Sequence, residues 1–143
     1  MQAVVVEQHG GREQLRLREV DTPTIQPDSV LIRVRACAVN FLDVWARRGL
    51  PGVKIPLPLI PGNDIAGVVE STGSLVDWLA PGDEVAVAPG VGCGHCQPCH
   101  DGDDNLCRHY RVIGYGRNGG YAEYAAVPAT TSEPLPVAWP SRR

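Results

Sequence analysis

The cysteines constrain the fold of this chain more than any other feature of its sequence. Four of them lie within fifteen residues, at Cys93, Cys96, Cys99 and Cys107, in the spacing C-x2-C-x2-C-x7-C. Structural zinc is held tetrahedrally by four Cys or His ligands, and short loops of this kind supply them. The spacing therefore predicts one structural Zn²⁺ per chain, bound by all four sulfurs in a lobe over about residues 90–110.

Two disulfides or four free thiols are the alternatives for this cluster. The N-terminus, MQAVVVEQHGG, has no positively charged region before its short apolar stretch, so it does not resemble a secretory signal. A reducing cytoplasm is then the expected location, and disulfides are rare there. Four ligands leave no open position for water, so the metal is expected to be structural. His95, His100 and His109 are interpreted as exposed neighbours of the cluster.

Composition narrows the class of protein. A chain of 143 residues can form one domain that buries roughly two thirds of its unfolded surface. The net charge of −3 gives no basic footprint for nucleic acid. No apolar run approaches the roughly 20 residues of a membrane helix. We therefore expect neither a nucleic acid nor a membrane as a partner.

Alternating apolar residues predict a mainly β chain. The clearest segment is 29–38, in which Val30, Ile32, Val34 and Ala36 are expected to face one way. Gly67 is expected to mark a bulge or a close approach of two backbones. These patterns predict a small, single-domain barrel with a zinc lobe; the other expected strands are Ala3–Glu7, an edge strand over 15–20, Ile65–Thr72, EVAVA from Glu84, and Tyr121–Val127.

One segment, NFLDVWARRG, changes to a helical period. Asn40 can cap the helix and Asp43 lies in its first turn. Phe41, Val44 and Trp45 are expected to form one apolar stripe, and Phe41 and Trp45 are interpreted as core residues rather than as a platform for a substrate. The prolines that follow predict an extended loop without regular structure. The domain is expected to span residues 1–130, and residues 131–143 to form an unpacked tail.

The order of these motifs resembles the N-terminal half of the medium-chain dehydrogenases/reductases, the zinc-type alcohol dehydrogenase and quinone oxidoreductase superfamily. The resemblance implies a GroES-like fold, a partly open β-barrel. It also implies an NAD(P)H-dependent oxidoreductase that acts on a small-molecule carbonyl or quinone substrate. The matching stretches are MQAVVVEQHGG, ACAVNFLDVWARRG, LIPGNDIAGVVESTG, PGDEVAV, the cysteine lobe ending in GDDNLC, and GGYAEYAAVP.

The sequence departs from the alcohol dehydrogenases at the catalytic zinc. The family's cysteine would fall at position 40 and its histidine–glutamate pair at 63 and 64, where this chain has Asn40, Asn63 and Asp64. Amides are poor zinc ligands beside thiolate or imidazole, so we expect no second zinc. Cys37 is interpreted as a small core residue rather than a displaced ligand.

These positions resemble the zinc-independent quinone and enoyl reductases instead. By that resemblance the cleft candidates are Asn40, Asp43, Asn63 and Asp64, although no firm catalytic residue follows. For Asn40 and Asp43, plain helix capping is an equal alternative.

The superfamily continues with a Rossmann domain that lies outside these residues. Gly114, Gly116 and Gly119 spell G-x-G-x-x-G, but a strand follows them where a dinucleotide fingerprint would open a helix. No cofactor-binding residue is therefore expected, and NAD(P)H would bind only in a longer parent protein. The surface against the missing domain is expected to expose Leu57, Leu59 and Ile60, with possible self-association.

Three functions remain open at this point. The first is the N-terminal catalytic-domain fragment of an oxidoreductase of the alcohol dehydrogenase or quinone reductase kind, inactive alone. The second is a stand-alone, zinc-stabilised binding or structural module without catalysis. The third is a thiol-based redox or zinc switch, which rests only on the cysteine cluster.

Overall fold

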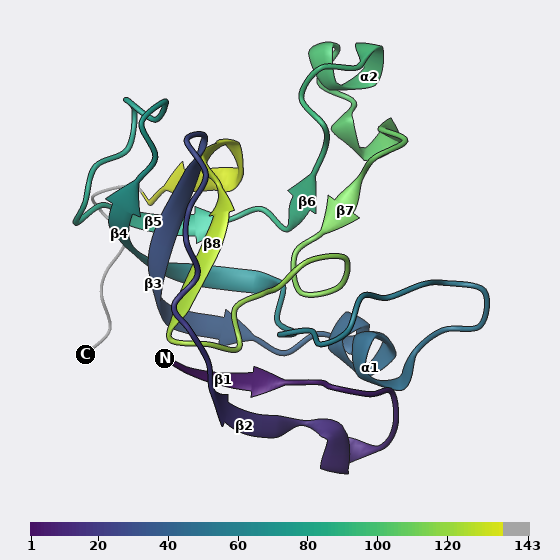
Figure 1. Cartoon of the computed structure of the whole chain (residues 1–143). Helices are drawn as coiled ribbons and strands as arrows, with labels where there is room; N and C mark the ends of the chain where they lie inside the picture. The colour runs from purple at the N-terminus through teal and green to yellow at the C-terminus, as the bar shows by residue number, and fades with distance from the viewer. Residues whose placement is uncertain (136–143) are drawn as a thin grey trace.

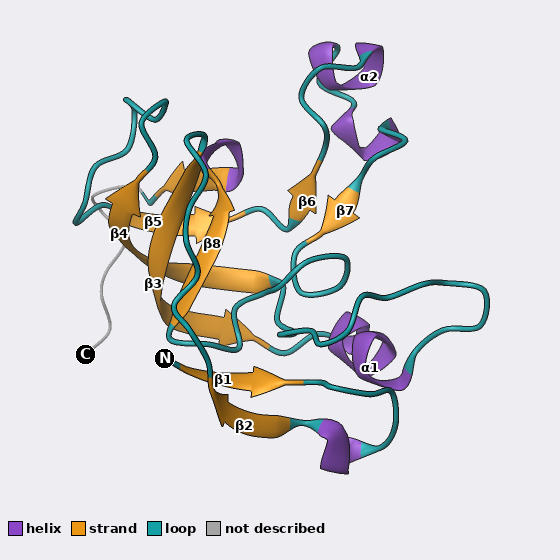
Figure 2. Ribbon diagram, viewed as in Figure 1, coloured by secondary structure: helices purple, strands orange, loops and turns teal. Residues whose placement is uncertain are grey.

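The computed structural model describes residues 1–135 and consists mainly of antiparallel strands (Figures 1 and 2). A five-stranded sheet has the order β8-β3-β4-β5-β9, and the pairs β1-β2 and β6-β7 form two small ribbons. The fold class expected from the sequence is confirmed. The strands are β1 (Gln2–Val5), β2 (Arg16–Glu19), β3 (Ser29–Ala38), β4 (Asp64–Thr72), β5 (Glu84–Val87), β6 (Gly90–Val91), β7 (Arg111–Val112), β8 (Tyr124–Pro128) and β9 (Ser132–Pro134).

The helices are short and lie outside the sheet. Figure 1 shows β6, β7 and α2 projecting from the main sheet as a separate lobe. No helix in residues 1–135 has the length and apolar character needed to cross a membrane. The helical elements are α1 (Phe41–Arg48), α2 (Gln97–His100), and the 3-10 turns η1 (Arg12–Gln14), η2 (Asp104–Leu106) and η3 (Ala129–Thr131).

The main core lies against the five-stranded sheet. The alternation predicted for β3 holds at Val30 and Ile32, which are fully buried. Its pairing with β4 then shifts between Val34 and Ala36. A bulge of this kind sends the next side chains to the opposite face. Ala36 is therefore exposed, contrary to the prediction, and Cys37 packs against the core instead.

Gly67 of β4 confirms the expected close approach of two backbones. A Cβ atom at this position would clash with the carbonyl oxygen of Arg33 on the neighbouring strand. Only glycine lets β3 and β4 stay paired at this point.

Phe41 and Trp45 lie side by side on α1, as the predicted stripe requires, but the interpretation of them as core residues is wrong. Phe41 and Trp45 are 68% and 43% exposed and contact each other edge-on, with their ring centroids 5.3 Å apart. The helix instead buries Asp43, Ala46 and Arg47. Burial of the two charged residues is tolerated because they are hydrogen-bonded, Arg47 through its Nη1, which donates to the carbonyl of Gly10 at 2.6 Å.

The proline-rich loop is irregular, as expected, but it exposes no leucine patch. Leu59 and Ile60 are 1% and 7% exposed, and Leu57 is half-buried. Leu57 and Leu59 pack with Ala46 of α1 and Ile55 in a small core of their own. The expected apolar surface at Leu57, Leu59 and Ile60 is therefore absent, because this loop folds back onto the helix.

The chain remains packed beyond residue 130, where an unpacked tail was expected. Ser132–Pro134 forms β9 and pairs with β5, and the N–H of Leu135 donates to the carbonyl of Glu84 at 2.8 Å. The prediction missed this strand because it has two prolines close by and no alternating pattern. The remaining residues of the predicted tail, 136–143, lie outside the described part of the chain.

Candidate functional sites

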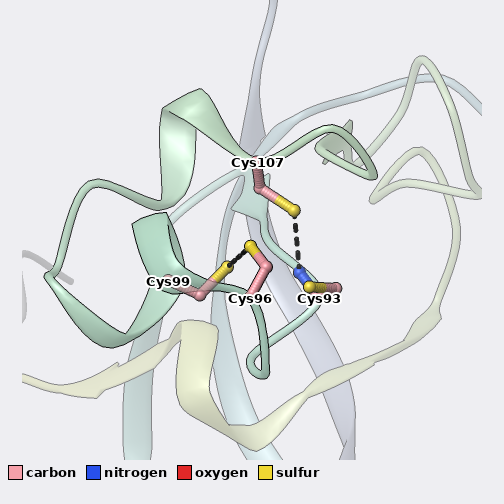
Figure 3. Close-up of side chains that lie close together, drawn as sticks. All are labelled: Cys93, Cys96, Cys99 and Cys107. Atoms are coloured by element: carbon pink, nitrogen blue, oxygen red, sulfur yellow. Dashed lines mark hydrogen bonds between the residues drawn. The ribbon is translucent and has the colours of Figure 1, made fainter.

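The four cysteines of the lobe converge on one point (Figure 3). Cys93 follows β6, Cys96 caps the N-terminus of α2, Cys99 lies within α2, and Cys107 follows η2. Their four Sγ atoms lie within 4.8 Å of one another. Four sulfurs at about 2.3 Å from one zinc would lie roughly 3.8 Å apart, so a small contraction of the cluster would accommodate the ion.

Backbone N–H groups of the lobe point at the sulfurs. Cys107 Sγ accepts hydrogen bonds from the N–H of Cys93 at 3.4 Å and from the N–H of His109 at 3.3 Å. Such bonds stabilise thiolate and orient it toward a metal. His95, His100 and His109 are exposed and stand outside the group of four cysteines, as expected.

The thiols of this cluster have unequal pKa values, because a thiolate at one sulfur disfavours ionisation of its neighbours. The pKa of Cys93 is lowered to about 6, chiefly because the backbone N–H of His95 bonds its sulfur. At Cys96 the N–H of Cys99 favours the thiolate, but burial and the neighbouring sulfurs outweigh it and raise the pKa to about 12. A divalent cation removes this repulsion by neutralising all four sulfurs together, so the donor set fits zinc.

A second group of polar side chains lies where the proline-rich loop ends and β4 begins. Asn40 Nδ2 donates to Asn63 Oδ1 at 3.2 Å and to Asp64 Oδ2 at 2.6 Å. We call Asn40, Asp43, Asn63, Asp64 and Tyr121 the polar cluster. The carboxylate of Asp64 only accepts hydrogen bonds, so the atom of Asn40 that faces it must be Nδ2. That orientation requires Asn63 to present Oδ1 to Asn40, which leaves Asn63 Nδ2 without a partner in residues 1–135.

Asp43 holds the polar cluster together. Its Oδ2 accepts from the N–H of Asn40 at 2.7 Å and from the hydroxyl of Tyr121 at 2.8 Å, and its Oδ1 accepts from the N–H of Gly62 at 3.0 Å. Asp43 is 8% exposed, so these three donors satisfy a buried charge. The pKa of Tyr121 is raised by burial and by Asp43. Asp43 therefore caps α1 and also fixes the segment that carries Asn63.

Tyr121 and Gly62 were not predicted as parts of this site. Tyr121 lies 78 residues from its partner Asp43, and no spacing rule connects two positions that far apart. Its sequence context, GGYAEY, indicates only a strand. The tertiary fold alone brings this hydroxyl to the carboxylate.

Cys37 borders the polar cluster and is half-buried, so it is less buried than predicted. Burial and, to a smaller extent, the negative charges of Asp43 and Asp64 together raise the pKa of its thiol to about 11. Within residues 1–135, Cys37 belongs to no group of three or more metal-ligating side chains.

The G-x-G-x-x-G segment is a turn, as expected, and it packs against Gly62 at the end of the proline-rich loop. Gly114 has φ of 77°, and a Cβ at Gly119 would clash with the carbonyl oxygen of Gly62. The chain continues into β8, so no helix N-terminus forms there in the described residues. These glycines instead allow the close approach that positions Gly62 and Asn63.

Known proteins resemble this chain in both sequence and fold. The family model "Alcohol dehydrogenase GroES-like domain" matches residues 26–137. The chain belongs to this family. An alcohol dehydrogenase from Geobacillus stearothermophilus is 42% identical over 131 residues, covering 90% of this chain and 38% of its own.

Two solved structures agree over the whole domain. A cobalt- and zinc-bound thermostable alcohol dehydrogenase from Pyrobaculum aerophilum is 42% identical with a TM-score of 0.86, and the match covers 94% of this chain and 40% of that one. A zinc-binding dehydrogenase from Sinorhizobium meliloti, bound to NADP, is 34% identical with a TM-score of 0.84, over 95% and 38%. The chain thus spans about two fifths of the length of these GroES-like relatives.

Proposed function

We propose that this GroES-like domain is the substrate-binding part of an NAD(P)H-dependent oxidoreductase that reduces a carbonyl or quinone without a catalytic zinc. The observation that carries the proposal is the amide of Asn40, which bonds Asn63 and Asp64 in a domain of the alcohol dehydrogenase family. Two amides and one carboxylate make a hydrogen-bonding site. They are a poor donor set for zinc, which prefers sulfur and imidazole nitrogen.

Asn63 Nδ2 is the group that would bind the substrate oxygen. The other atom of this amide, Asn63 Oδ1, accepts a hydrogen bond from Asn40. The backbone just before Asn63 is held by the bond from the N–H of Gly62 to Asp43. A fixed N–H donor stabilises the negative charge that develops on a carbonyl oxygen during hydride transfer, and such a donor is worth roughly 10²–10³ in rate. The cofactor supplies the hydride when it is bound.

The four cysteines would hold one structural zinc in this proposal. The ion would cross-link Cys93 and Cys107 across the lobe and take no part in the reaction, because its shell is closed. The NAD(P)H site would belong to the part of the relatives that these residues do not cover. We therefore expect the 143-residue chain by itself to bind NADPH weakly and to show no turnover.

The test is an assay of the protein encoded by the complete reading frame that contains these residues. NADH or NADPH oxidation with a panel of aldehydes and quinones should give turnover, and Asn63→Ala should lower kcat about 100-fold. Asn105→Ala, an exposed amide in the lobe, is the matched control and should leave kcat unchanged. Inactivity of the complete protein with every cofactor and substrate would favour the alternative, a zinc-stabilised binding or structural module.

A further inference from the structure

A cavity of about 610 Å³ lies between the proline-rich loop and the base of the cysteine lobe. Lys54 and Pro56 of the loop line one side, and Arg111 of β7 lines the other. The cavity is outside the polar cluster, since the two share no residue. Nothing in the function proposed above uses it.

The charge of this cavity is positive in a protein that is negative overall. The chain carries 13 Lys and Arg against 16 Asp and Glu, yet none of the residues lining the cavity is acidic. Lys54 is the single lysine of the chain. In residues 1–135 the ion pairs are Arg18–Glu7 and Arg33–Glu70, so neither Lys54 nor Arg111 is neutralised by one. Two cations at one cavity without a counter-charge attract an anion.

The walls between these charges are apolar and aromatic. Tyr110, Tyr115 and Val53 contribute them. Tyr115 packs against the small core that contains Ile55 and Leu59. Such walls favour a ligand that has an apolar or aromatic body as well as a charged group.

We propose that this cavity binds a small organic anion, a carboxylate or a phosphate monoester on an apolar or aromatic body. Lys54 and Arg111 recognise the anionic group, and the tyrosines contact the body. The arginine can bind two oxygens of one anion side by side, since only its Nη1 is used, in a bond to the carbonyl of Tyr110.

The position of the cavity connects it to the polar cluster through one loop. Gly114, in the segment after β7, packs directly on Gly62, which precedes Asn63. The cavity and the polar cluster thus share no residue but are joined by this backbone contact. Anion binding in the cavity does not depend on the proposed function.

Calorimetry on the zinc-loaded 143-residue chain tests the proposal without any cofactor or turnover. Benzoate and phenyl phosphate are the anionic probes, and benzamide is the neutral probe of the same shape. At least one anion should bind at least 10-fold more tightly than benzamide, and 0.5 M salt should weaken it. The ratio of benzoate to phenyl phosphate affinity decides between the carboxylate and the phosphate.

Three variants complete the experiment. Lys54→Gln and Arg111→Gln should each weaken the anion at least 5-fold, while Arg16→Gln, an equal charge change on the exposed strand β2, should not. Equal binding of benzamide, equal loss in Arg16→Gln, or no binding to folded chain would each overturn the proposal. If the chain binds anions but the complete protein lacks all oxidoreductase activity, the proposal of an anion site is supported and the proposed function is rejected.

Discussion

The hydroxyl of Tyr121 donates a hydrogen bond of 2.8 Å to Oδ2 of Asp43, joining the segment before β8 to the first turn of α1. Asp43 also accepts from the backbone of Asn40 and Gly62. One buried carboxylate thus positions Asn40, Tyr121 and the segment that leads into Asn63. This arrangement is independent of the cysteine lobe, so the two sites can be perturbed separately.

Tyr121→Phe should lower the free energy of unfolding by about 1–2 kcal/mol, because a hydrogen bond to a charged acceptor is lost. Urea unfolding of zinc-loaded protein measures the change. Tyr124→Phe on β8 is the matched control, since the Tyr124 hydroxyl has no hydrogen-bond partner among the described residues. Equal destabilisation by the two variants would argue against the role given to Asp43.

Purified chain should contain one zinc, and Cys96→Ser should reduce its affinity strongly, because one of four ligands is lost. In zinc-finger peptides, the binding of a structural zinc contributes roughly 10–16 kcal/mol to the free energy of folding. Metal removal should therefore increase hydrogen exchange in residues 90–110 while the five-stranded sheet stays protected. Elemental analysis gives the stoichiometry, and Cys37→Ser should retain the metal. A second zinc that is lost in Asp64→Ala would contradict the metal-free polar cluster.

Gly119→Ala should destabilise the domain by about 1–3 kcal/mol, because its methyl group would overlap the carbonyl of Gly62. Gly116→Ala would press only on the flexible side chain of Arg111 and make an ordinary contact with the backbone of Val112, so it should change stability by less than about 0.5 kcal/mol. Thermal unfolding measures both. If the glycines served a dinucleotide instead, Gly119→Ala would leave stability intact and change only NADPH affinity.

Cys37 should react slowly with iodoacetamide at neutral pH. Its pKa of about 11, against an ordinary value near 9, leaves about 100-fold less thiolate at pH 8. The reaction rate should rise with pH up to about 11, as measured by mass spectrometry of the labelled peptide. Asp64→Asn removes a nearby negative charge and should speed the labelling. A rate in the native protein equal to that of the unfolded chain would contradict the raised pKa.

The raised pKa of Cys37 also makes the stability of the folded domain depend on pH. The folded state favours the protonated thiol of Cys37, so this contribution is complete below about pH 9 and is lost as the pH rises toward 11. Cys37→Ser should remove this part of the alkaline loss, which urea unfolding at pH 8 and pH 10.5 can measure.

Local features of this protein could be predicted from its sequence. Alternation at Val30 and Ile32 identifies the strand and its buried face because side-chain direction repeats every two residues. The cysteine spacing brings four sulfurs together because all four lie on one short loop, so the cluster depends little on distant contacts. Asn40 and Gly49 likewise mark the two ends of α1 through their local backbone preferences.

The buried face of α1 and of the second half of β3 depends on contacts between distant parts of the chain. Residues Phe41 and Trp45 have the spacing of a core stripe, yet Asp43 and Arg47 face inward because partners from Tyr121 and Gly10, far along the chain, satisfy them. A bulge in β3 exchanged Ala36 for Cys37 at the core, and Ser132 joined the sheet because β5 offered a free edge. Hydrogen-bond partners between distant residues leave no periodic signal in a sequence, so they appear only when the chain is folded.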